Sequence, residues 1–422
     1  AQPLTTNANS AKYTAITNFA SSIITGTITA SAINTTTSGT DNLIAGQDAG
    51  DSIQSGGQYN VLLGHDAGTA ITTGDYNVLL GNDAGFGITT GGSNVVIGHQ
   101  AMDASSGAAD GMVAIGVEAL STFNGGNVDS SVAVGEYSLN SLTDGVSNVA
   151  VGTKALATNT ASNNTAVGNE ALRYNTTGTE NVAVGTYSLD ANTTASDNTA
   201  IGYNALTSNT TGGSNTACGN AAMTSNTTGV RNTAVGQASL FNNTTGSQNT
   251  ALGDDALNSN TEGSDNVAVG KDALKANTTG ERNTAFGYGS MDANTTGSYN
   301  HASGYLALSS NTTADNNTGV GYKALEDNTT GTANVALGNH ALTANTTGAS
   351  NVALGANALQ ANTTAEQNTA LGKSSLQANT TGANNTAVGK DALYANSTGS
   401  SNIAVGRSAL AQNTTASNNT GV

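Results

Sequence analysis

The chain has 422 residues, of which 53 are Gly, one is Pro and only 9% are charged. Its 28 acidic residues outnumber 11 Lys and Arg, and the net charge of −17 argues against binding nucleic acid or an anionic membrane through a basic surface. The single Cys, Cys218, excludes an intrachain disulfide framework, and no run of 18 apolar residues predicts a membrane span.

Residues 1–40 lack the repeat that fills the rest of the chain. Their stretch SSIITGTITASAI is apolar and rich in β-branched residues, which favours extended structure. We expect residues 1–40 to form an attachment or capping segment, because an uncovered sheet edge invites aggregation. In a fibre, this end would bind a virion or cell-surface attachment protein.

Residues 41–163 contain an irregular repeat whose units each end a short apolar stretch with Gly. These anchor glycines are Gly46, Gly64, Gly81, Gly98, Gly116, Gly135 and Gly152, spaced 16 to 19 residues apart. The first units read GQDAG, GHDAG and GNDAG, so Asp48, Asp66 and Asp83 should stack in one column. Stacked carboxylates repel unless water solvates them or a cation such as Ca²⁺ bridges them, and both alternatives stay open.

Residues 164–422 repeat a 17-residue phrase such as NTAVGNEALRYNTTGTE without a change of length. Anchors from Gly168 to Gly406 give fifteen regular coils, and 22 coils in all. We number positions in a coil from its anchor Gly. The fixed positions are Asn at −4 (Asn164, Asn181, Asn198), the anchor itself (Gly168, Gly185, Gly202), Leu at +4 (Leu172, Leu189, Leu206) and Asn at +7 (Asn175, Asn192, Asn209).

This period predicts an all-β fold, a parallel β-solenoid with two strands in each coil. NTAVG would be one strand and ALxxN the second, with turns after the anchor and at TTG. Helical repeats usually need about 30 residues or more. Stacked Asn side chains would form ladders, as in cross-β structures, and 22 coils at about 4.8 Å each give a length of about 105 Å.

Alternation along the NTAVG strand puts Thr165 and Val167 on one face and Ala166 on the other. We expect Leu and Ala to fill the thin interior, and the Thr/Val and Val/Ile/Leu rows to pack against other chains. The reverse, with the Ala row at the interface, stays open. Either arrangement leaves an apolar face that needs a partner, and closed symmetry of three chains predicts a homotrimer.

One coil departs from the apolar pattern in NHASG, where His301 and Ser303 replace the usual Thr or Val and an apolar residue. If this face meets a threefold axis, three imidazoles would lie at one level. They could ligate a transition metal, hold an anion when protonated, or be satisfied by Ser303 and water without an ion. No other cofactor is expected.

NTAVGNEAL and its copies resemble the head repeats of YadA-like trimeric autotransporter adhesins, and the full 17-residue phrase resembles repeats of phage tail-fibre proteins. The resemblance covers about residues 41–422 and implies a trimeric, left-handed parallel β-roll. No stalk coiled coil, membrane anchor or self-cleaving chaperone domain accompanies it in this sequence.

The resemblance therefore favours a structural role, the shaft of a trimeric virion fibre that holds a receptor-binding tip away from the particle. The alternative is a bacterial surface adhesin or extracellular filament. No enzyme is expected, since paired carboxylates or metal-ligand spacings are lacking, and an ice-binding Thr array is disfavoured because the Thr pairs fall in turns. The final NNTGV begins another coil, so we expect the natural chain to continue past Val422.

Overall fold

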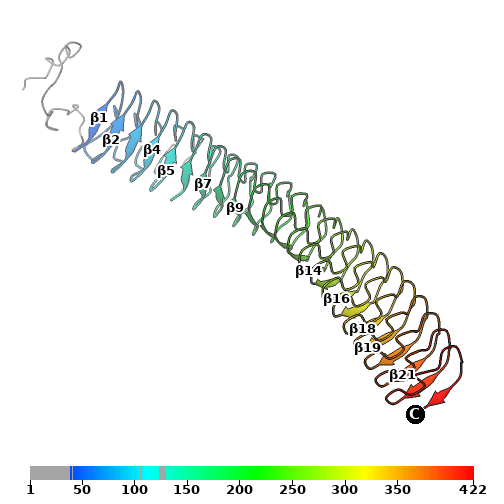
Figure 1. Cartoon of the computed structure of the whole chain (residues 1–422). Helices are drawn as coiled ribbons and strands as arrows, with labels where there is room; N and C mark the ends of the chain where they lie inside the picture. The colour runs from blue at the N-terminus through cyan, green and yellow to red at the C-terminus, as the bar shows by residue number, and fades with distance from the viewer. Residues whose placement is uncertain (1–38, 40, 105–106, 123–129) are drawn as a thin grey trace, which may run out of the picture. The chain divides into compact units, whose positions relative to one another are not determined.

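The computed structural model describes residues 39, 41–104, 107–122 and 130–422, and these form one parallel β-solenoid (Figure 1). Consecutive strands pair in register, so that Thr165 lies opposite Val182 and Ala166 opposite Ala183. The described residues contain strands and turns but no helix. The expected capping segment, residues 1–40, lies outside the described residues apart from residue 39.

The described residues form 23 short strands in a single sheet. Their bounds are β1 Leu43–Ala45, β2 Val61–Leu63, β3 Val78–Leu80, β4 Val95–Ile97, β5 Val113–Ile115, β6 Val132–Val134, β7 Val149–Val151, β8 Thr165–Val167, β9 Val182–Val184, β10 Thr199–Ile201, β11 Thr216–Cys218, β12 Thr233–Val235, β13 Thr250–Leu252, β14 Val267–Val269, β15 Thr284–Phe286, β16 His301–Ser303, β17 Thr318–Val320, β18 Val335–Leu337, β19 Val352–Leu354, β20 Thr369–Leu371, β21 Thr386–Val388, β22 Ile403–Val405 and β23 Thr420–Gly421.

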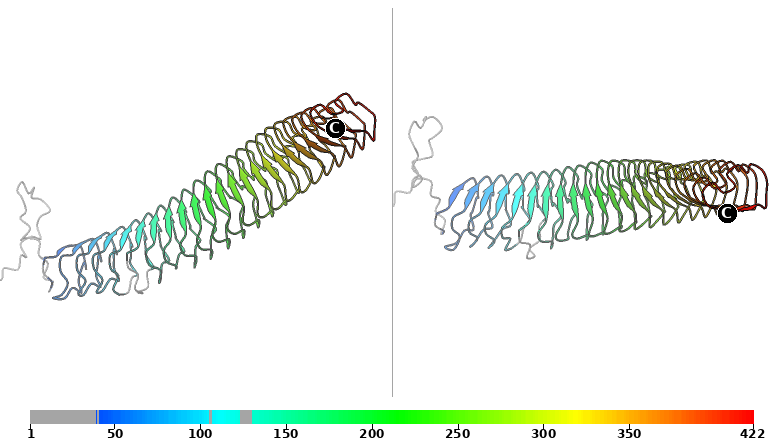
Figure 2. Two further views of the ribbon diagram at one scale, coloured as in Figure 1. Left: turned by 90° about the horizontal axis from the view of Figure 1, so that it is seen from below. Right: turned by 60° about the horizontal axis from the view of Figure 1, so that its bottom comes forward.

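The sheet continues without a break from the irregular coils into the regular ones. β7 pairs with β8 across residues 163 and 164, with Val149 opposite Thr165. Figure 2 shows the strands following one another along the solenoid from β1 to β23. The variable coil lengths upstream of residue 164 are therefore accommodated between the strands, and the pairing register is unaffected.

The prediction of a second strand at ALxxN is wrong. Positions +1 to +6 form consecutive turns, and the backbone is left-handed at +2, just before this segment, and at +4 within it, as at Glu170 (φ 54°) and Leu172 (φ 53°). A strand requires an extended backbone at successive residues, and position +4 interrupts it. Coils still bond to each other here, because the Leu172 amide donates to the Ser188 carbonyl at 2.9 Å. Each coil thus has one strand, and stacked turns form the opposite side.

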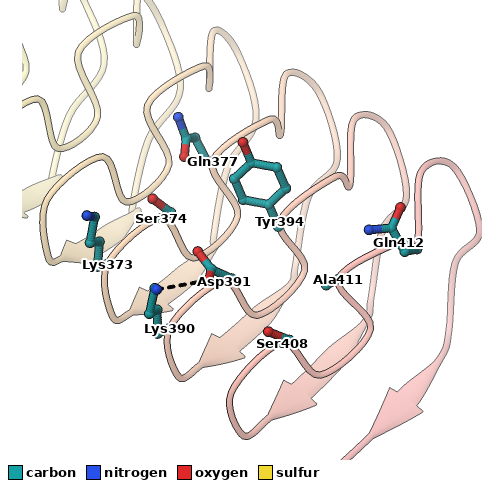
Figure 3. A pocket seen from close by; sticks show the side chains of 9 residues that line it. All are labelled: Lys373, Ser374, Gln377, Lys390, Asp391, Tyr394, Ser408, Ala411 and Gln412. Carbon is teal, nitrogen blue, oxygen red and sulfur yellow. Dashed lines mark ion pairs between the residues drawn. The ribbon is translucent and has the colours of Figure 1, made fainter.

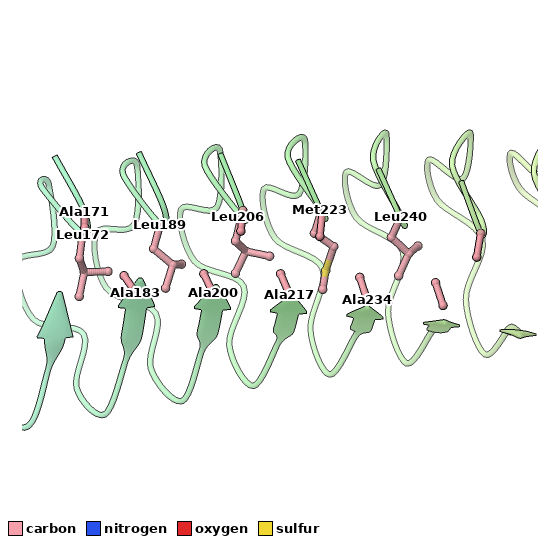
Figure 4. Packing of buried hydrophobic residues seen from close by; sticks show 14 of the residues in the cluster. Ala171, Leu172, Ala183, Leu189, Ala200, Leu206, Ala217, Met223, Ala234 and Leu240 are labelled. Carbon is pink, nitrogen blue, oxygen red and sulfur yellow. The ribbon is translucent and has the colours of Figure 1, made fainter. Parts of the chain in front are cut away.

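The interior is a thin layer of Ala and Leu between the sheet and the stacked turns. Ala166 in the middle of β8, and Ala171 and Leu172 in the turns, are completely buried. Figure 4 shows the same arrangement in the following coils, with Met223 in place of one Leu. The Ala row therefore faces inward, as expected, and the alternative in which it forms an interface is wrong.

The first coils fill the same interior with a different set of side chains. Leu62 and Leu79 take the position of the strand Ala, while Gly68 and Gly85 take that of the turn Leu. A Cβ on Gly68 would lie 2.8 Å from Leu79 Cδ1, so the larger strand residue needs the smaller turn residue. The Ile of these coils, such as Ile71, is fully buried where later coils have Asn. The interior thus stays filled, because a larger residue in the strand is matched by a smaller residue in the turns.

The anchor Gly holds a backbone conformation that an L-residue rarely adopts. Gly168 has φ 142°, and an added Cβ would lie 2.6 Å from the carbonyl carbon and oxygen of Gly185 in the next coil. The coils therefore approach closely at this corner, and Gly is needed both for φ and for space.

We predict that Gly168→Ala lowers the free energy of unfolding by about 2–5 kcal/mol, the sum of backbone strain and overpacking. Gly213→Ala is the control, because an added Cβ there would lie 3.2 Å from its nearest neighbour, the Ser196 carbonyl oxygen, and the equivalent position of adjacent coils already carries Ser196 and Val230. Urea unfolding followed by circular dichroism measures both variants. Equal losses in the two would contradict the special role of the anchor.

Candidate functional site

Asn side chains at position −4 form a continuous ladder at the start of the strands. The Asn164 side-chain carbonyl accepts from the Asn181 amide at 3.0 Å and from Asn181 Nδ2 at 3.2 Å. Asn198 repeats the backbone bond to Asn181 at 3.0 Å. All three side chains are fully buried. This column therefore continues the hydrogen bonding of the sheet past the end of each strand.

Asn at position +7 forms a second ladder, on the turn side. Asn192 Nδ2 donates to Asn175 Oδ1 at 2.8 Å, and Asn209 Nδ2 donates to Asn192 Oδ1 at 3.0 Å. The two ladders meet at one carbonyl oxygen, because Asn181 Nδ2 (2.8 Å) and Asn192 Nδ2 (3.0 Å) both donate to that of Ala195. Each coil is thus tied across its corner by two buried amides and one carbonyl.

The first Thr of each NTT sequence forms a third column, which sequence reasoning assigned only to a turn. Thr176 Oγ1 donates to the Thr193 carbonyl at 2.9 Å, and Thr193 Oγ1 donates to that of Thr210 at 3.2 Å. The second Thr, such as Thr177, is exposed. The three ladders together hold the coils in register around most of their circumference.

The outward face of the sheet is the largest candidate interaction surface. It carries the residues at −3 and −1, whereas the Ala between them points inward. At −1 the exposed apolar side chains include Leu252 (47%) and Leu354 (45%). The others with large exposure in these two columns are Leu43, Val151, Val167, Ile201, Phe286, Val335, Leu337, Ile403 and Val405. We call these two columns the apolar stripe.

His301 interrupts the apolar stripe. It is exposed on the outward face of β16, and its backbone pairs with Thr284 on one side and Thr318 on the other. Ser303 shares that face two residues later and is partly buried. The structure thus places Ser303 in line with Phe286 and Val320 of the neighbouring coils, whereas His301 lies between two Thr.

The three Asp of the first coils are not equivalent. Asp48 and Asp66 lie together with His65, their potential ligand atoms being within 4.8 Å of one another, while Asp83 is outside this group. His65 Nδ1 lies 2.9 Å from Asp66 Oδ2. Sequence reasoning missed His65, although its position beside Asp66 and one coil after Asp48 was visible. The group has two carboxylates and one imidazole, a donor set that suits a transition metal better than Ca²⁺.

Several partly buried carboxylates occupy position +5 in the turns. Burial raises the pKa of Asp190 above its ordinary value of 3.8, the charge of Glu170 raises it further, and Arg173 lowers it. Asp190 Oδ1 has no hydrogen-bond partner among the described residues. Burial likewise raises the pKa of Asp103 and of Asp292 at the same position. Position +5 therefore favours side chains that are neutral or paired with an opposite charge.

Comparison with known proteins assigns no family to this geometry. No family model matches the sequence, and no curated protein is significantly similar to it. Within the described residues, no helix has the length and hydropathy needed to cross a bilayer. The functional argument therefore depends on the apolar stripe, the ladders and the variable turn positions.

We predict that Asn192→Ala lowers the free energy of unfolding by about 2–4 kcal/mol, because it removes two donated bonds and leaves the Asn209 amide without its buried acceptor. Asn220→Ala, at an exposed turn position, is the control and should change stability by less than about 0.5 kcal/mol. Chemical denaturation measures both. A neutral Asn192→Ala would show that backbone pairing alone holds the coils.

We predict that Asp190→Asn raises the melting temperature at pH 7. A raised pKa means that the folded chain holds a proton which the unfolded chain releases, so the free energy of unfolding falls as the pH rises from 3.8 through the folded pKa. The advantage of the variant should therefore vanish below pH 3.8. Asp197→Asn, at an exposed position, serves as control. An advantage that is independent of pH would contradict this explanation.

Proposed function

We propose that the chain is the shaft of a homotrimeric virion fibre, built as a left-handed β-solenoid, that holds a receptor-binding tip away from the particle. The observation that carries the proposal is the apolar stripe. Monomeric proteins in water rarely expose a contiguous apolar surface of this kind, whereas fibres bury it between chains. The role is structural, and no catalytic step is assigned to the chain.

The repetition of the stripe favours a second copy of the same chain as its partner. Two parallel copies in the same register present each level of the stripe to an identical level, so one favourable contact is repeated along the solenoid. The stripe is only one three-residue strand wide. Three such narrow surfaces can close around a central axis without leaving an apolar edge, which favours cyclic symmetry of three chains.

Assignment to a virion is supported by the resemblance of the 17-residue phrase to tail-fibre repeats. In this arrangement the N-terminal segment binds the particle, and a tip beyond the last coil contacts the host receptor. A bacterial surface adhesin is the competing function and would use the same trimer. The coding sequence after Val422 distinguishes them, since a tip with a chaperone domain supports the fibre and a β-barrel anchor supports the adhesin.

His301 and Ser303 gain a role in such a trimer. Three copies of each would meet at one level of the interface, where copies in correct register bring the imidazoles of His301 together. An ion bound by three imidazoles and a hydrated polar layer are both compatible with this placement. Metal analysis of the purified trimer, beside that of the His301→Val variant, separates the two.

We predict that the protein is a trimer in solution and that Val235→Asp with Leu252→Asp dissociates it, because assembly would bury two unpaired carboxylates per chain. Thr228→Asp with Thr245→Asp is the matched control. It adds the same charge at an exposed turn position where the chain already has Glu262. Size-exclusion chromatography with light scattering gives the mass. A single-chain mass for the native protein would refute the proposal.

A further inference from the structure

Three cations occupy the same position, +1, in three successive coils of a strongly acidic chain. Lys373, Lys390 and Arg407 are three of only 11 Lys and Arg. Residues 372–422 contain a single acidic residue, Asp391, so three cations against one carboxylate give this section a net charge of +2. Such a concentration of positive charge within a chain of net charge −17 marks a local surface of different chemistry.

Side chains at position +1 lie over one another along the solenoid. Tyr288, Tyr305 and Tyr322 hold this position in three other successive coils, and their rings stack with centroids 5.4 and 5.5 Å apart. The coils keep the same register at the cations, since the Asp391 amide donates to the Lys373 carbonyl at 3.1 Å. Position +1 therefore presents the three cations as a row.

The row of cations is only partly neutralised. Lys390 Nζ lies 3.6 Å from Asp391 Oδ2, and both side chains are substantially exposed, so this pair contributes little. No ion pair within the described residues involves Lys373 or Arg407, and both are exposed. Elsewhere, Lys275 contacts both Asp255 and Asp272 at 3.0 and 2.8 Å. The three stacked cations thus repel one another and present a site for an anion.

An open groove of about 450 Å³ runs beside two of these cations, Lys373 and Lys390, across three coils (Figure 3). Its lining combines two of the cations with hydroxyls, amides, one carboxylate and one aromatic ring: Lys373, Ser374, Gln377, Lys390, Asp391, Tyr394, Ser408, Ala411 and Gln412. Tyr394 is 43% exposed. Ala411 follows it at the same position of the next coil, and its single methyl group leaves space beside the ring.

We propose that this groove binds an anionic saccharide chain. Its carboxylate or sulfate groups would pair with Lys373 and Lys390, the apolar face of one sugar ring would pack on Tyr394, and sugar hydroxyls would bond to the Gln and Ser side chains. A simple phosphate ion would use the cations but not the ring. A groove that spans successive coils suits a linear polymer, whose charges recur along its length.

The groove is separate from the apolar stripe. Its lining residues come from positions +1, +2, +5 and +6 in the turns, whereas the stripe occupies −3 and −1 on the sheet. In Figure 3 the strands lie apart from the exposed ring of Tyr394. Saccharide binding by these turn residues therefore does not depend on the proposed fibre function.

The test is isothermal titration of the full chain with hexagalacturonate, at a salt concentration of about 0.15 M where long-range repulsion is screened. Lys373→Gln with Lys390→Gln should weaken binding at least about tenfold, the loss expected from two charged contacts. Tyr394→Ala should weaken it at least about threefold. The methyl ester of the same hexasaccharide, which lacks the charges, should bind as weakly as the double variant does to the acid.

Lys271→Gln with Lys323→Gln is the matched control, because it removes two cations from positions +1 and +2 of coils outside the groove. It should leave the dissociation constant unchanged, and circular dichroism checks that every variant is folded. Equal losses in both double variants would overturn the proposal in favour of diffuse charge attraction. Hexaglutamate binding as tightly as the saccharide, with no effect of Tyr394→Ala, would overturn it in favour of acidic peptides. Absence of binding by the native chain would also overturn it.

Discussion

One buried carbonyl oxygen in almost every regular coil, shared by two Asn amides, is the constraint on which the solenoid depends. Strands of three residues are too short to hold a coil by sheet pairing alone. The Ala195 carbonyl joins Asn181 at the start of the strand to Asn192 at the end of the turns. Because each of these side chains also bonds to its counterpart in the adjacent coil, closing one coil and stacking it on the next are the same interaction. Stability then accumulates along the chain from nearest-neighbour contacts.

The short repeat also leaves apolar side chains on the exterior of the sheet. Only two small residues, Ala or Ser in almost every case, and one Leu or Met fill the apolar interior of a regular coil, so the thin core cannot accommodate the Val, Ile and Leu at −1. These side chains instead emerge from the sheet, where each strand aligns them with the next. A solenoid with a larger cross-section could have turned them inward. The narrow coil and the need for a partner along the stripe are therefore two consequences of one short repeat.

Much of this architecture was predictable, because the period of 17 residues makes equivalent positions visible by counting. The parallel stacking, the Asn columns and the Ala and Leu interior follow from that count and from strand alternation. The second strand was predicted wrongly because Leu172 gives no sign of a left-handed backbone. The signal was in the first coils, where Gly68 and Gly85 stand at the same position with φ near 60°. Position +4 is Gly in the first coils and Leu in later ones. This exchange indicated that the backbone is constrained there, in addition to the difference in side-chain volume.

The failure to predict the remaining site residues from the sequence has a different cause. His65 beside Asp48, and the lining of the saccharide groove, consist of residues that vary between coils and were judged singly. In a stacked fold, residues 17 apart become neighbours, as in the contact of Lys271 Nζ with Asp254 Oδ2 at 3.4 Å. Opposite charges in successive coils thus form pairs, and like aromatic rings form stacks. A row of like charges differs from these favourable contacts, because stacked side chains of the same charge repel one another unless a ligand of opposite charge is bound. The variable turn positions should therefore be compared between residues 17 apart as well as along the chain. At these positions such a solenoid can gain binding sites without any change to the ladders that hold it together.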